Sequence, residues 1–137
     1  MAITAGISKV VLNVANVFES ARFYSEVMGL ERDPEAPDER WGWAWFCTGE
    51  PGSEQRLGLH QGRMAYEDYS PTPAGPRHRT VHFALHIPHK NLDELVERLR
   101  SKGIDLHGPA SHDWVRAVSY YLFDLDGNLI ELFSPLG

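Results

Sequence analysis

The chain has 137 residues, of which 42% are hydrophobic and 23% are charged, a composition typical of one globular domain. Its formal net charge of -6 argues against a nucleic-acid surface, because little basic charge is left to neutralise phosphates. No apolar run approaches the roughly 20 residues of a membrane-spanning helix. Residues 1–6 lack the basic flank of a signal peptide, and a single cysteine excludes an internal disulfide. We therefore expect a cytoplasmic protein with neither nucleic acid nor membrane as its partner.

The first predicted elements are a strand and a helix. Polar and apolar residues alternate over 9–14, and this period of two predicts a strand with its apolar members on the buried face. Asn16, with Glu19 three positions later, forms the capping box of a helix expected over 17–28. Gly29 follows and ends that helix.

Further strands are expected at 41–48 and 56–61, with a short one near Arg32. The strand at 41–48 carries three tryptophans of one parity, at Trp41, Trp43 and Trp45. Three indoles on one strand face can form a flat apolar wall for a planar ligand. Alternatively, they can pack against a helix or against a dimer partner.

The second half repeats this order about 73–75 residues later. Alternation over 82–87 predicts a strand, and Asn91 with Glu94 repeats the capping box of a helix that Gly103 ends. The remaining strands are expected near Leu106 and at 116–123 and 128–134.

A proline-rich loop at 67–79 connects the halves, because its prolines can continue neither a strand nor a helix. The predicted fold class is therefore α+β, with two βαβββ modules at 7–66 and 80–135. We expect these modules to form a single domain, 1–137, in which a curved mixed sheet surrounds a cleft.

Glu131 is the most informative candidate residue, because a carboxylate flanked by Leu and Phe on its strand face needs a cation, a metal or hydrogen-bond donors. Strand parity places Glu131 on the same kind of face as His82, Lys9 and His60. Imidazole and carboxylate suit Zn²⁺, Ni²⁺, Fe²⁺ or Mn²⁺. His82 and Glu131 are therefore the predicted metal ligands, with His60 as the candidate third. The open alternative is that His82 simply hydrogen-bonds Glu131 in a cleft that holds no metal.

The other candidate residues are weaker. His86 lies four residues along the strand from His82, about 13 Å away, so the two cannot share one ion. Arg116 and Tyr121 can bind an anionic or hydroxylated substrate, or take part in ordinary surface and hairpin pairing. Four histidines surrounded by glycine, proline and polar residues are expected to be solvated loop residues: His78, His89, His107 and His112.

The closing segment 124–132 reads Asp-x-Asp-Gly-Asn-x-x-Glu-Leu, and a histidine strand opens the second module. Together with segments 11–14, 20–24 and 28–30, this motif resembles the vicinal oxygen chelate superfamily. That group contains glyoxalase I, fosfomycin-resistance thiol transferases, extradiol dioxygenases and bleomycin-resistance proteins. The resemblance spans essentially the whole chain, and it implies paired βαβββ modules around a U-shaped cleft that a homodimer often completes.

In metal-dependent members, a His on the first strand, a His opening the second module and a Glu on the last strand hold a divalent ion. The resemblance assigns the second and third of these positions to His82 and Glu131. The first position falls on Lys9, whose ammonium is no ligand and repels a cation. A fourth position, used by glyoxalase-like members, falls on Gly58, with His60 close by.

Two functions are compatible with this resemblance. The first is a metal-dependent lyase, thiol transferase or dioxygenase that acts on a small oxygen-bearing substrate, with Glu131 as acid or base if it is linked to the metal. The second is a metal-free binding protein of the bleomycin-resistance type, in which Lys9 replaces the metal and pairs with Glu131. The candidate substrate-binding residues are Lys9, Trp43, Trp45, Arg116 and Tyr121.

Overall fold

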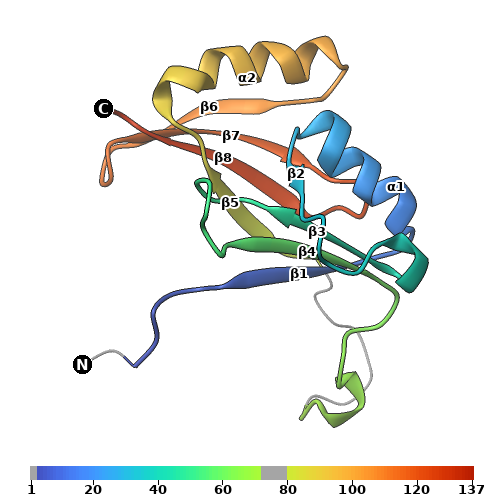
Figure 1. Cartoon of the computed structure of the whole chain (residues 1–137). Helices are drawn as coiled ribbons and strands as arrows, with labels where there is room; N and C mark the ends of the chain where they lie inside the picture. Colours follow the sequence, from blue (N-terminus) through green and yellow to red (C-terminus); the bar gives the residue numbers. More distant parts are fainter. Residues whose placement is uncertain (1–2, 72–79) are drawn as a thin grey trace. The chain divides into compact units, whose positions relative to one another are not determined.

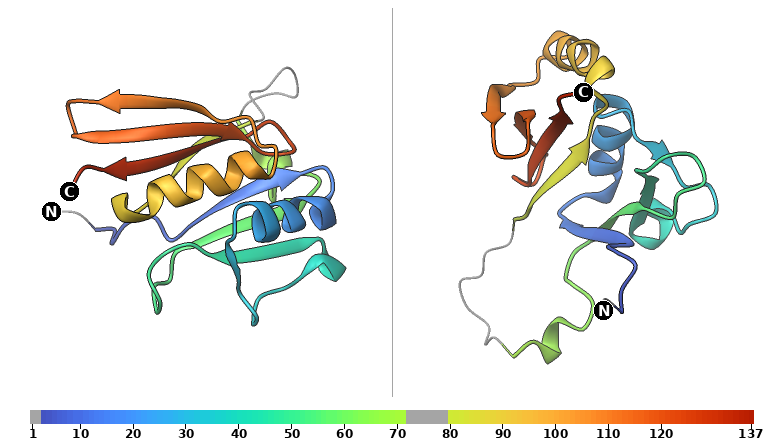
Figure 2. Two further views of the ribbon diagram at one scale, coloured as in Figure 1. Left: turned by 90° about the horizontal axis from the view of Figure 1, so that it is seen from above. Right: turned by 90° about the vertical axis from the view of Figure 1, so that its left-hand side faces the viewer.

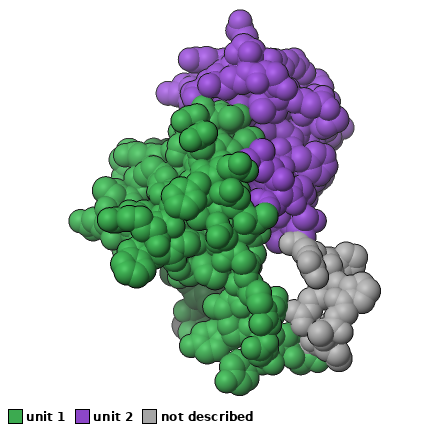
Figure 3. Space-filling view, turned by 90° about the vertical axis from the view of Figure 1, so that its right-hand side faces the viewer, with its two compact units in different colours: residues 1–77 green, residues 78–137 purple. Residues whose placement is uncertain are grey.

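The computed structural model describes residues 3–71 and 80–137. The chain divides into two compact units, 1–77 and 78–137 (Figure 3). Each unit contains one four-stranded mixed sheet, so the predicted α+β fold of two βαβββ modules is confirmed, with a separate sheet in each module. The connecting loop predicted at 67–79 begins with a 3₁₀ turn, η3 (Glu67–Tyr69). The rest of that prediction, from residue 72 to 79, lies outside the described residues.

In the first unit, β1 runs parallel to β4, and the other neighbouring strands of the order β1-β4-β3-β2 are antiparallel (Figure 1). Alternation buries one face of this sheet, as predicted for 9–14. Helix α1 contacts β3 and β4 on the buried face. The elements that precede η3 are β1 (Lys9–Val14), α1 (Val17–Arg22), the π-helical segment η1 (Phe23–Val27), β2 (Glu31–Arg32), the 3₁₀ turn η2 (Glu39–Trp41), β3 (Trp43–Cys47) and β4 (Arg56–Gln61).

Two details of the first unit differ from the prediction. Asn16 does cap α1, accepting a hydrogen bond from the Glu19 backbone N–H at 3.1 Å. However, the expected helix over 17–28 changes to π geometry at 23–27 and closes with a bond from Met28 N to Phe23 O. The strand expected at 41–48 begins only at residue 43, because a left-handed glycine separates it from the η2 turn that contains Trp41.

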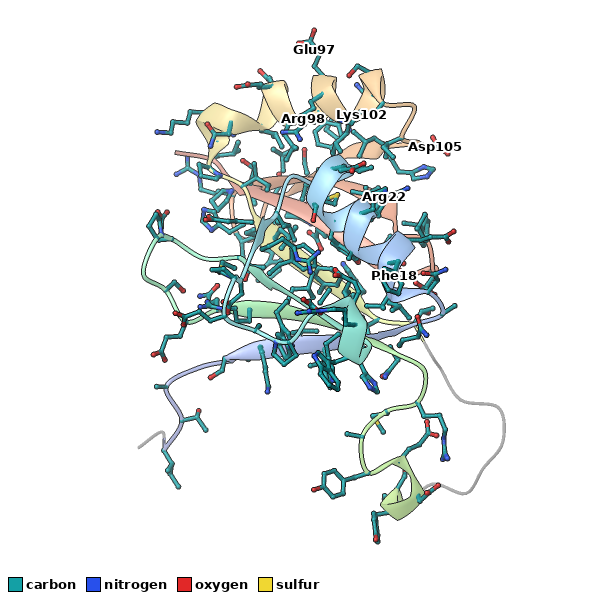
Figure 4. All side chains as sticks on the ribbon, turned by 45° about the vertical axis from the view of Figure 1, so that its right-hand side comes forward. Phe18, Arg22, Glu97, Arg98, Lys102 and Asp105 are labelled. Atoms are coloured by element: carbon teal, nitrogen blue, oxygen red, sulfur yellow. The ribbon has the colours of Figure 1, made fainter. Side chains whose placement is uncertain are left out.

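The second unit repeats the same topology in the order β5-β8-β7-β6, with β5 parallel to β8. Helix α2 lies along one face of this sheet (Figure 2) and buries Leu92, Val96 and Leu99. Glu97 projects from α2 away from the sheet (Figure 4). The elements are β5 (His82–His86), α2 (His89–Ser101), β6 (His107–His112), β7 (Ala117–Phe123) and β8 (Leu129–Pro135).

The second helix begins earlier than predicted. Asn91 is not its cap, because α2 starts at His89 directly after Pro88, and Asn91 N already donates to Pro88 O at 2.8 Å. Proline suits this position because it has no N–H to leave unpaired and its φ of -53 matches a helix start. Arg116, expected at the start of a strand, adopts a left-handed φ of 51 in the turn before β7.

Candidate functional site

His82 and Glu131 are in direct contact on adjacent strands of the second unit. β5 and β8 run parallel, with Ala84 opposite Glu131 in the register, so His82 lies one alternation earlier on the same face. His82 Nε2 is 2.9 Å from Glu131 Oε1. The His82 side chain is 50% exposed, whereas that of Glu131 is only 12% exposed. The pair therefore joins a nearly buried carboxylate to an imidazole that solvent can reach.

The Asp-Gly-Asn turn of the closing motif holds these two strands together. Asp124 Oδ1 accepts from the Asn128 backbone N–H at 2.8 Å, and Asp124 Oδ2 accepts from the Asn128 side-chain amide at 2.9 Å. Asn128 Oδ1 accepts in turn from the backbone N–H of Val81 at 3.0 Å. Val81 directly precedes His82, so the buried Asp124–Asn128 pair fixes the start of β5 beside β8.

The second oxygen of Glu131 has its own partners on the opposite side. Ser119 on β7 donates its hydroxyl to Glu131 Oε2 at 2.6 Å, a distance typical of a charge-assisted hydrogen bond. His112 Nε2 lies 3.1 Å from Ser119 Oγ, 3.2 Å from the Tyr121 hydroxyl and 3.6 Å from Glu131 Oε2. Five side chains from four strands thus form one connected polar cluster, His82, Glu131, Ser119, His112 and Tyr121.

These contacts set the protonation of two members of the cluster. Burial by itself raises the pKa of Glu131, but the hydrogen bonds from Ser119 and His82 outweigh it and hold that pKa below the usual value. Burial, followed by the nearby Glu131 charge, raises the pKa of the Tyr121 phenol. At neutral pH, Glu131 is consequently a carboxylate and Tyr121 keeps its proton.

His112 was expected to be a solvated loop residue, and this expectation is wrong. It ends β6, where antiparallel pairing with β7 brings it beside Ser119 and Tyr121. The sequence signal was weak because β6 contains Gly108 and Pro109, residues that ordinarily indicate a loop. The loop expectation is also wrong for His89, which begins α2 and contacts Ser134 Oγ at 3.3 Å, and for His107, which begins β6 and lies 3.6 Å from Asp105. His78 lies outside the described residues.

Four of the predicted residues form a second cluster in the first unit, on the sheet face opposite α1. The indoles of Trp43 and Trp45 stack with centroids 5.4 Å apart and an interplanar angle of 12°. The Lys9 ammonium lies 5.1 Å from the Trp45 ring centroid. The ring centroids of His60 and Trp43 are 4.3 Å apart. His60 Nδ1 is also 3.5 Å from the Asn13 amide nitrogen.

Gly58 allows this stacking. A Cβ at Gly58 would lie 2.6 Å from the Trp45 ring, so the indole occupies the space that a side chain on β4 would fill. This is the position that the resemblance assigned to a fourth metal ligand, and a glycine there supplies no donor. The close approach of Trp45 gives the physical reason for glycine.

Trp41 and Arg116 lie outside these clusters. Trp41 is 76% exposed in the η2 turn, so the predicted wall of three indoles contains two. Trp41 contributes instead to a shallow surface depression lined by Glu35, Ala36, Pro37, Asp38, Arg40, Trp41 and Trp43. Arg116 is exposed, and its backbone carbonyl accepts from Leu136 N at 2.8 Å.

The profile of the Glyoxalase/Bleomycin resistance protein/Dioxygenase superfamily matches residues 6–132. The chain belongs to this superfamily. Solved structures agree with its fold: a virulence protein from Salmonella typhimurium is 25% identical, with a TM-score of 0.72 over 98% of this chain and 100% of that chain. A glyoxalase/bleomycin resistance protein/dioxygenase from Nocardioides is 25% identical, with a TM-score of 0.69 over 99% of this chain and 87% of that one. A lactoylglutathione lyase from Agrobacterium tumefaciens is 22% identical, with a TM-score of 0.68 and coverage of 97% and 96%.

The superfamily often uses divalent metals, and imidazole nitrogen and carboxylate oxygen are donor types that such ions bind. Two ligands about 2.1 Å from one ion lie about 3 Å apart at right angles and about 3.4 Å apart in tetrahedral geometry. His82 Nε2 and Glu131 Oε1 are 2.9 Å apart, which is also the distance of a hydrogen bond. Across residues 3–71 and 80–137, no group of three or more His, Cys, Asp or Glu side chains is arranged to hold an ion. His82 and Glu131 are thus two candidate ligands in the second unit, and in the structure their contact is a hydrogen bond.

None of the helices in the part of the chain that the structure describes is both long enough and apolar enough to cross a membrane.

Proposed function

We propose that this member of the superfamily is a metal-dependent enzyme that acts on a small oxygen-bearing molecule, with His82 and Glu131 as ligands of a Zn²⁺, Ni²⁺, Fe²⁺ or Mn²⁺ ion. The observation that supports this proposal is the 2.9 Å separation of His82 Nε2 and Glu131 Oε1 at a solvent-accessible position. An ion bound there supplies a Lewis acid that polarises a substrate oxygen.

The residues around the pair have separate tasks in this proposal. Ser119 holds the Glu131 carboxylate in one orientation through its 2.6 Å hydrogen bond. The Glu131 carboxylate accepts a hydrogen bond from His82 Nε2–H, and a metal ion held by Nε2 would require that proton to lie on Nδ1 instead. The Tyr121 hydroxyl, which keeps its proton at neutral pH, binds a substrate oxygen as a donor.

Three reactions are candidates: isomerisation of a thiol adduct, addition of a thiol to an epoxide, and oxidative ring cleavage. Each starts from a molecule whose oxygen atoms can bind one ion. Assays with a hemithioacetal, an epoxide with added thiol, and a catechol distinguish the three. If the protein converts one of these three substrates and leaves the other two unreacted, the reaction type is identified.

Metal analysis tests the proposal directly. Protein purified without chelator and incubated with each of the four metals is expected to retain about one ion per chain. His82→Ala should lose this ion, whereas His86→Ala, on the same strand and face, should retain it. Absence of bound metal with all four ions would contradict the proposal, and unchanged metal content in His82→Ala would contradict the ligand assignment.

His60 stays a predicted further ligand. If it binds the metal, the His60→Ala variant should contain less metal than the wild type. The Lys9 ammonium contacts the Trp45 ring, and its substrate-binding role also stays a prediction. A homodimer and a cytoplasmic location complete the proposal. Sedimentation analysis of the purified protein measures the first of these.

A second candidate function is metal-free binding of a planar compound at the Trp43–Trp45 stack. The contacts of this stack with Lys9 and His60 favour it, because they combine aromatic surface with a cation. One face of Trp45 is already stacked on Trp43, so the compound would bind at the Lys9 side. Quenching of tryptophan fluorescence by aromatic compounds, lost in a Trp43→Ala/Trp45→Ala double variant, would support binding. Equal quenching in the two proteins would contradict it.

A further inference from the structure

We propose that Ser119 and His112 form a hydrogen-bond chain of one fixed direction, starting at Glu131, and that this direction keeps His112 from accepting the Tyr121 hydroxyl proton, which can then pass from Glu131 to a bound molecule as hydrogen-bond partner. In this chain His112 is a positioning residue, which acts on Tyr121 and on Ser119 without contacting the substrate. The inference deepens the proposed function, on which its substrate-binding consequence rests.

The direction of the chain begins at the carboxylate. An ionised Glu131 can only accept hydrogen bonds, and its Oε2 lies 2.6 Å from Ser119 Oγ. Ser119 has one hydroxyl proton, and this short bond uses it. Toward any other neighbour, Ser119 Oγ can therefore only accept a hydrogen bond.

His112 is that neighbour, with Nε2 at 3.1 Å from Ser119 Oγ. If Nε2 had no proton, two lone pairs would face each other at hydrogen-bond distance inside a largely buried cluster. Nε2 therefore carries a proton and donates it toward Ser119. The nearby Glu131 Oε2, 3.6 Å from Nε2, favours the same arrangement electrostatically.

The state of Tyr121 follows from the state of His112. The Tyr121 hydroxyl lies 3.2 Å from His112 Nε2, and a protonated Nε2 cannot accept from it. The Tyr121 hydroxyl therefore does not donate to His112, and its own proton is not used at this contact. In the ligand-free protein this proton is directed toward Glu131, whose charge and hydrogen bond act on the phenol. A bound molecule with a carbonyl, ether or hydroxyl oxygen can then receive it.

The first experiment measures which ring nitrogen carries the proton. Two-bond ¹H–¹⁵N correlation spectra of ¹⁵N-histidine protein at pH 8, with His112 assigned by its absence in His112→Gln, distinguish Nε2–H from Nδ1–H. We expect Nε2–H for His112. An Nδ1–H form would overturn the inference, because Nε2 would then accept from Tyr121 and consume its proton.

The second experiment changes the donor and acceptor pattern at Glu131, where the hydrogen-bond chain starts. Glu131→Gln replaces two accepting oxygens with one acceptor and one donor at nearly the same volume, so one of its two neighbours must reverse its hydrogen bond. We expect either His112, through Ser119, or His82 to move its proton to Nδ1. If neither histidine changes, the chain does not start at Glu131 and the inference fails.

His89 serves as the internal control in these spectra, because it contacts another buried serine, Ser134, and its ring state should be the same in both proteins. The measurement needs no metal and no substrate. A failure of metal binding would therefore contradict the proposed function and leave the hydrogen-bond chain intact. Conversely, an Nδ1–H form of His112 would contradict the hydrogen-bond chain and leave the proposed metal binding intact.

Discussion

The hydroxyl of Ser119 donates to Glu131 Oε2 at 2.6 Å, while His82 contacts the other oxygen at 2.9 Å. The carboxylate is thus fixed from two sides by residues on β7 and β5. One partner is fully buried, and the other is half exposed. Of the two partners of Glu131, His82 is therefore the one that solvent can reach.

Removing the buried partner should weaken metal binding. In Ser119→Ala, Glu131 loses the bond that orients it, so Zn²⁺ affinity measured by competition with a chromophoric chelator should fall roughly ten- to hundredfold. Ser134→Ala, also at a buried serine of the second unit, should leave this affinity unchanged. Equal affinities in wild type and Ser119→Ala would show that the serine does not orient a metal ligand.

Stability should depend on pH through Glu131. Its folded pKa is below the ordinary value of 4.5, so its contribution is present above that value and is lost as the pH falls through the folded pKa. Urea unfolding of wild type and Glu131→Gln between pH 7 and pH 2.5 should show a stability difference that shrinks toward acid. A difference that is constant over this range would mean that the Glu131 charge does not stabilise the fold.

The turn that fixes β5 beside β8 should matter for stability. Asn128→Ala removes the bonds to Val81 and Asp124, and should lower the free energy of unfolding by about 1–3 kcal/mol. Leu125→Ala, in the same turn at an exposed position, should have little effect. If the two variants unfold at the same urea concentration, the Asn128 side chain is not what holds this turn.

The tryptophan stack should not tolerate a side chain at Gly58. In Gly58→Ala the new Cβ would overlap the Trp45 ring, so the indole must move and the free energy of unfolding should fall by about 1–3 kcal/mol. The tryptophan emission spectrum should also change. Val11→Ala, opposite Gly58 on β1 and 37% exposed, is the matched control and should change neither measurement. A Gly58→Ala variant with wild-type emission would contradict the close approach.

Much of the fold was predictable because local rules act on short segments. Alternation identified β1 and β4, and the Asn16 cap identified the start of α1. Boundaries failed where one residue overrides a pattern. Gly42 separates Trp41 from β3, and Pro88 starts α2 ahead of Asn91.

By itself, the sequence determined the repeated order of elements and the more buried face of the strands that alternate clearly, such as β1 and β5. These follow from the period of two and from the repeat, which act along the chain and need no knowledge of distant neighbours. Only the tertiary structure decided that His82 contacts Glu131, that Ser119 and His112 complete the cluster around Glu131, and that Trp45 lies over Gly58. Those relationships depend on which strands pair and in which register, and register across strands is set by packing of the whole sheet.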